Sequence, residues 1–207
     1  MISERGFNFT FETVRDWVER FAPLVIEELR AKRAGKAGFS WYTDETYVRI
    51  KGEWCYLYRT IDREGQLVET MLSKTRDMAA ARRFLTSARN VTKRRPERVT
   101  TDGHPAYPKA ITETCGSTVE HRTTPYLHSY TEQSHRNVKN RYTFTHGFNK
   151  FKFGFVVLRG HEELRNFMRP PSWRTLSAKK MRCIRRAKMH SLNCLENRVA
   201  FRSSNSS

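Results

Sequence analysis

The chain is poor in acidic residues relative to basic ones: 21 Asp and Glu stand against 39 Lys and Arg, which gives a formal net charge of +18. A surface this positive has a polyanion as its natural partner, and nucleic acid is the leading candidate. The sequence also lacks a long uncharged apolar run, a signal peptide and a basic amphipathic helix with a clean apolar face. We therefore expect no membrane partner.

Cysteine is scarce, and none of the four cysteines is spaced as in a CxxC motif. This spacing argues against both a zinc knuckle and a disulfide framework. We expect reduced thiols in a cytoplasmic, nucleoid-associated protein. The sequence has no internal repeats and implies no small-molecule cofactor. The four cysteines are Cys55, Cys115, Cys183 and Cys194.

Changes in periodicity divide the chain into four regions. Apolar residues at helical spacing from residue 8 onward predict a small helical unit over residues 1–33, and the short glycine-containing segment 34–38 is predicted to be a linker. Residues 39–169 are predicted to form the main domain. The basic region 170–207 ends in SSNSS, and this composition predicts a tail that is partly disordered.

Within the main domain, a period of two predicts strands, and turn signals separate them. Thr75 is predicted to cap the helix that follows the third strand. The expected order is three antiparallel strands, a helix, a strand, a short helix, a strand and further helices, which predicts an α/β fold with a sheet of mixed direction. The predicted strands cover residues 39–50, 54–61, 66–72, 99–102 and about 117–123, and a later helix covers residues 131–142.

Three carboxylates occur in settings that suit a catalytic site: Asp44 and Asp102 in predicted strands, and Glu132 in a predicted helix. Asp44 is on the more apolar strand face, where a lone aspartate is costly. Asp102 ends a short strand, and ligands of open α/β sheets gather at such carboxyl ends. If the fold brings the three together, they would repel one another without divalent cations. The trio therefore predicts a two-metal site for phosphodiester chemistry.

Each carboxylate also has an ordinary explanation. Asp44 could be a locally hydrogen-bonded residue near a strand end, Asp102 part of an Asp-Gly turn, and Glu132 one member of a solvated helix face. Glu45 points to the opposite strand face from Asp44, and we expect no ligand role for it. The helix that begins near Glu132 carries potential phosphate partners on the same face: His135, Arg136 and Lys139.

The chain resembles the DDE transposases of bacterial insertion sequences, most nearly the insertion-sequence-six group, in the segments WYTDETYVRIKGEWCYLYRTIDREG, VTTDGHPAYPKAI and TEQSHRNVKNRY. The resemblance covers residues 11–169. It implies an RNase H-like fold with an integrase-like core, which is a five-stranded mixed sheet flanked by helices. It also implies that Asp44, Asp102 and Glu132 are the catalytic residues and hold two Mg²⁺ or Mn²⁺ ions, and that Lys139 helps to position DNA.

The activity implied by this resemblance is metal-dependent DNA strand cleavage and strand transfer during transposition. The implied partner is double-stranded DNA, as transposon ends and as target, and the protein is expected to act on DNA as a homo-oligomer. Residues 1–33 resemble only part of the family's helical DNA-binding region, so we expect a chain shortened at its amino terminus. The alternative is a shortened protein that binds DNA without catalysing transposition.

Overall fold

The computed structural model describes residues 2–4, 7–124, 148, 150–169, 182–184 and 186–194. The predicted helix over residues 131–142, with Glu132, His135, Arg136 and Lys139, lies outside this part of the chain. The chain divides into two compact units, one made of Met1–Arg30 with Gly160–Ser207, and the other of Ala31–Arg159.

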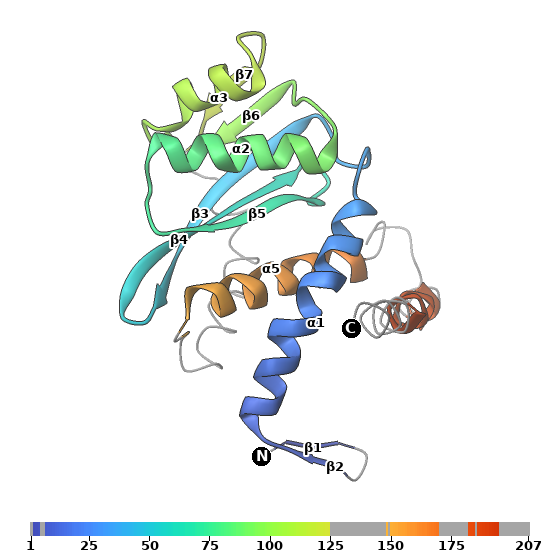
Figure 1. Ribbon diagram of the computed structural model, residues 1–207. Helices are drawn as coiled ribbons and strands as arrows, with labels where there is room; N and C mark the ends of the chain where they lie inside the picture. Colours follow the sequence, from blue (N-terminus) through green and yellow to red (C-terminus); the bar gives the residue numbers. More distant parts are fainter. Residues whose placement is uncertain are drawn as a thin grey trace. The chain divides into compact units, whose positions relative to one another are not determined.

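The unit Ala31–Arg159 is built on a five-stranded sheet with the strand order β5-β4-β3-β6-β7 (Figure 1). β4 pairs antiparallel with both β3 and β5, whereas β6 runs parallel to β3 and β7 runs parallel to β6. This arrangement confirms the mixed, RNase H-like sheet expected from the sequence. The strands are β3 (Ser40–Ile50), β4 (Glu53–Asp62), β5 (Leu67–Ser73), β6 (Arg98–Thr101) and β7 (Glu120–Thr123).

Tight turns join the antiparallel strands. Lys51 and Gly52 both have positive φ, which suits a two-residue turn between twisted strands. The next turn is organised by Asp62, which is 1% exposed and whose carboxylate accepts hydrogen bonds from the backbone N–H groups of Gly38, Glu64 and Gln66. These bonds satisfy a buried charge and fix where β4 ends.

One face of the sheet is covered by α2 (Met78–Thr92) and α3 (Tyr107–Cys115), as Figure 1 shows. The apolar residues of α2 pack into this core. Its N-cap is Asp77 rather than the predicted Thr75, because the Asp77 side chain accepts the hydrogen bond of the Ala80 backbone N–H. Buried members of this core include Trp41, Tyr58, Phe84, Leu85, Val99 and Ile111.

The opposite face of the sheet packs against the first half of α5 (Phe151–Met168). Glycine at position 154 allows this close approach, since a Cβ there would lie 3.1 Å from the Ile50 side chain and 3.1 Å from the Phe148 ring. Val48 and Ile50 belong to this second core. Because side chains alternate along a strand, Asp44 is on the same face of β3.

The other unit contains α1 (Phe11–Ala31) and a two-stranded antiparallel pair, β1 (Ile2–Glu4) with β2 (Phe7–Phe9). The prediction of a helix from residue 8 was therefore wrong at its start, where residues 8 and 9 are extended. Within the basic tail, residues 182–184 and 186–194 are helical, and Leu192 packs with Leu29. Among the described helices, none is both long and apolar enough to cross a membrane.

Candidate active site

The pairing of β3 with β6 places two of the predicted catalytic residues at the same level of the sheet. Ser40 pairs with Arg98 and Tyr42 with Thr100 in parallel register. Asp44 and Asp102 each follow two residues further along their own chains. Since neighbouring parallel strands keep their residues in step, the structure brings these two aspartates together although they are distant in sequence.

Asp44 is a buried carboxylate in the middle of β3. The residue is 3% exposed, and its Oδ1 accepts a hydrogen bond from the Glu45 backbone N–H at 2.7 Å. Its cross-strand partner in β4 is Arg59, which is 7% exposed. Residues directly opposite one another share a sheet face, so an arginine accompanies this aspartate where burial makes a lone charge costly.

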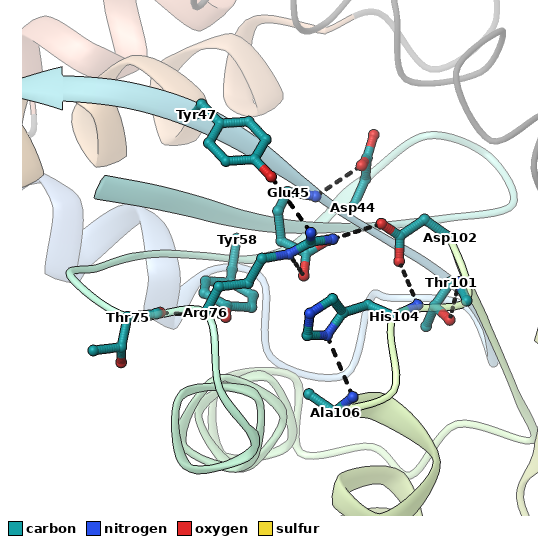
Figure 2. Close-up of polar contacts among 11 residues, drawn as sticks. Asp44, Glu45, Tyr47, Tyr58, Thr75, Arg76, Thr101, Asp102, His104 and Ala106 are labelled. Carbon is teal, nitrogen blue, oxygen red and sulfur yellow. Dashed lines mark hydrogen bonds and ion pairs between the residues drawn. The ribbon is translucent and has the colours of Figure 1, made fainter. Parts of the chain in front are cut away.

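Asp102 lies one residue beyond the end of β6, rather than inside the strand as predicted. Its Oδ1 accepts the backbone N–H of His104 at 3.0 Å, and its Oδ2 lies 2.7 Å from Nη2 of Arg76 (Figure 2). Its side chain is 30% exposed. His104 is turned to its own loop, where its Nδ1 accepts from the Ala106 backbone N–H at 3.3 Å.

Glu45 leaves β3 on the side opposite to Asp44, as the alternation of the strand predicts (Figure 2). Its side chain is 2% exposed, and its Oε1 lies 3.5 Å from Nε of Arg76. Burial raises the pKa of Glu45 to about 7; a hydrogen bond from Tyr107 opposes this rise, the charge of Asp102 adds to it, and Arg76 lowers the value. Glu45 thus belongs electrostatically to the same site as Asp102.

Arg76 is the residue of this site that the sequence did not reveal. It precedes α2 in a loop, in a stretch with no periodic pattern, and it joins acids that are far away in the chain. The segment SKTRD offers no spacing that predicts such contacts. The contacts that assign Arg76 to the site exist only once the sheet has formed.

The donors of this site suit a hard divalent cation. Carboxylate oxygens are the ligands that Mg²⁺ prefers, and Asp44 in β3 and Asp102 just after the neighbouring β6 present such oxygens. Within the described residues, no group of three or more His, Cys, Asp or Glu side chains is arranged to hold a metal ion. The predicted third carboxylate, Glu132, lies outside those residues.

Comparison with known proteins places the chain in a family. A protein family described as a DDE domain matches residues 38–170. The transposase for insertion sequence-like element IS431mec of Staphylococcus aureus is 36% identical over 149 residues, which are 69% of this chain and 65% of that protein. The transposase for insertion sequence element IS257 in transposon Tn4003, also from Staphylococcus aureus, is 37% identical over 145 residues, or 67% of this chain and 63% of that protein.

Among solved structures, the chain is similar to the HTLV-2 integrase catalytic core domain in complex with magnesium, in its dimeric form. The sequence identity is 19% and the TM-score is 0.48, and the match covers 73% of this chain and 99% of that one. The chain spans 65% of the length of the first of the curated relatives. The family match itself covers more than half of the chain. The protein therefore belongs to the DDE-domain transposase family of insertion sequences, in the insertion-sequence-six group.

Proposed function

We propose that this protein is a DNA transposase that cleaves DNA strands and transfers them during transposition of an insertion sequence. The observation that carries the proposal is the register of β3 and β6, which sets Asp44 and Asp102 side by side in a domain of the DDE family. Its relatives in Staphylococcus aureus are transposases. Glu132 is proposed as the third carboxylate.

The proposed cofactor is a pair of Mg²⁺ or Mn²⁺ ions held by Asp44, Asp102 and Glu132. Such ions supply an activated water or DNA 3′-hydroxyl and stabilise the leaving oxygen in phosphodiester chemistry. The chain's own part is to hold the ligands in place. The Glu45 backbone N–H orients the Asp44 carboxylate, and the His104 backbone N–H orients that of Asp102.

The proposed substrate is double-stranded DNA, with which the excess of 39 Lys and Arg over 21 Asp and Glu is compatible. His135, Arg136 and Lys139 are proposed to contact the phosphate backbone near the catalytic carboxylates. Residues 1–33 are proposed as part of a DNA-binding region, and residues 170–207 as a basic segment that adds affinity without sequence specificity. The protein is proposed to act on DNA as a homo-oligomer.

The experiment that tests this function is nicking of a labelled DNA duplex by the purified protein with Mg²⁺ or Mn²⁺. The variants Asp44→Asn and Glu132→Gln should each lose more than about 100-fold in nicking rate, because loss of a metal ligand should exceed the effect of losing an outer-shell contact. Both should keep their affinity for DNA. A chelator should abolish nicking by the wild type.

A matched control is Glu113→Gln, which removes a carboxylate that pairs with Arg82 at 3.0 Å on the helical side of the domain. It should nick DNA at the wild-type rate. Nicking retained by Asp44→Asn would rule out the proposed site. A wild type that binds DNA in a salt-sensitive way but never nicks it would instead support the alternative of a DNA-binding protein without catalysis.

A further inference from the structure

A cation with no part in the proposed chemistry lies among the acids of the site. Arg76 belongs to the segment between β5 and α2, and its side chain is 23% exposed. Its guanidinium contacts Asp102 (Nη2 to Oδ2, 2.7 Å), Glu45 (Nε to Oε1, 3.5 Å) and the Tyr47 hydroxyl (Nη1 to Oη, 3.4 Å). Figure 2 shows it between the carboxylates of Glu45 and Asp102. One side chain thus connects β3 with the end of β6.

The contact with Arg76 completes the environment of Asp102. One oxygen of this carboxylate accepts the His104 backbone N–H, and the other takes the guanidinium. A charged N–H to carboxylate contact of 2.7 Å is among the stronger hydrogen bonds in proteins. The planar guanidinium also fixes direction, unlike the point charge of a lysine. Arg76 and the His104 backbone N–H therefore set the orientation of Asp102 together when no metal is bound.

Two carboxylates of the site share one counter-ion. Glu45 and Asp102 both contact the guanidinium of Arg76, at 3.5 Å and 2.7 Å. The same guanidinium also lies 3.4 Å from the Tyr47 hydroxyl, so its position between the two acids is fixed by three contacts. Neighbouring carboxylates stay ionised together only when a positive charge compensates them. Arg76 supplies that charge to Glu45 and Asp102.

We propose that Arg76 is a positioning residue of the active site: it is the counter-ion that holds Asp102 in place before metal binds, and a divalent cation competes with it for the Asp102 carboxylate. This inference rests on the metal site of the proposed function. The guanidinium keeps the metal-free site assembled, and its positive charge weakens metal binding. Loss of Arg76 therefore has two opposite effects: it destabilises the metal-free protein and tightens its binding of a divalent cation.

The test measures the melting temperature of the full chain against the concentration of Mn²⁺ or Mg²⁺, without DNA. Arg76→Gln should melt below the wild type when no metal is present. Metal should also begin to raise its melting temperature at a concentration lower by about tenfold or more, which is the effect of one nearby charge on a carboxylate equilibrium. Arg76→Lys keeps the charge and should bind metal as the wild type does.

The control is Arg82→Gln, which also removes one arginine from an ion pair, at a side chain that is 51% exposed. Its metal response should equal that of the wild type. A purely structural role of Arg76 predicts a lower melting temperature with an unchanged metal response. That result would overturn this inference and leave the proposed function intact. Weaker metal binding by Arg76→Gln would do the same, and so would tighter metal binding by Arg76→Lys. A wild type without any metal-induced stabilisation overturns the metal site of the proposed function as well.

Discussion

At the scale of single residues, the position after Asp102 determines how the chain turns away from the end of β6. Gly103 has a φ of +89°, a backbone conformation that L side chains rarely adopt. A Cβ at this position would meet the Thr123 side chain at 3.8 Å, which is ordinary contact. The cost of a side chain here therefore comes from backbone strain and not from crowding.

We expect Gly103→Ala to lower the free energy of unfolding by about 1–2 kcal/mol, the cost of a left-handed backbone for an L residue. It should also reduce DNA nicking, because the strain is relieved by moving the adjacent Asp102. Gly35→Ala is the matched control: Gly35 has a φ of +72°, and no atom lies within 4 Å of its added Cβ. Urea unfolding should show similar losses for both variants. If both variants lost nicking activity equally, the loss in Gly103→Ala would be due to lower stability and not to displacement of Asp102.

The residues of the site differ in how visible they are in the sequence. The alternation of β3 predicts that Asp44 and Glu45 face opposite sides, and the structure confirms it. Asp102 accepts the backbone N–H of His104 in its own loop and also follows the register that puts it beside Asp44, so the local contact and the position next to β3 occur together. Arg76 was not predictable, because its contacts depend on three segments that meet only in the folded sheet.

At the scale of elements, the helix cap of α2 was predicted two residues before its actual position. Thr75 and Asp77 are both good capping residues. The structure selects Asp77, whose carboxylate accepts the Ala80 backbone N–H at 2.7 Å. This backbone hydrogen bond, aided by one from the Thr75 side chain, lowers the pKa of Asp77. The two residues thus act together, with Asp77 as the cap.

We expect Asp77→Ala to lower the melting temperature at neutral pH more than Thr75→Ala does, because only the first leaves the Ala80 N–H without its cap. The pKa of Asp77 is lowered by folding, so its contribution is present above the pKa of an unfolded aspartate and is lost as the pH falls through the folded value. The difference between wild type and Asp77→Ala should therefore shrink in acid. Thermal unfolding between pH 2 and 7 measures it, and a difference that grows in acid would contradict this account.

The elements that the sequence predicted well are those with strong periodicity. β3, β4, β5 and α2 follow from alternating or helical apolar patterns, with bounds that shift by a few residues. The pair β1 and β2 was missed because two three-residue strands carry no pattern of their own. Their extended conformation depends on pairing with each other, which local propensity does not report.

At the scale of the whole molecule, the net charge of +18 is the dominant property. We expect DNA binding to weaken by on the order of 10³-fold between 50 and 200 mM salt, which is the loss for about six phosphate contacts. Fluorescence anisotropy with a labelled duplex measures this dependence. Asp44→Asn should give the same slope, since it changes no phosphate-binding cation. Binding that is insensitive to salt would show that charge is not the source of affinity.

The short pairing of β3 with β6 also determines at which positions this chain can accept inserted residues. The level of Asp44 relative to Asp102 is set by the three pairs from Ser40–Arg98 to Tyr42–Thr100. One residue added between Tyr42 and Asp44 would turn Asp44 to the other side of the sheet. Residues added at the exposed positions Arg63 and Glu64 would leave that pairing intact. Natural insertions, or an engineered fluorescent label, should therefore be tolerated at this turn and rejected at the start of β3.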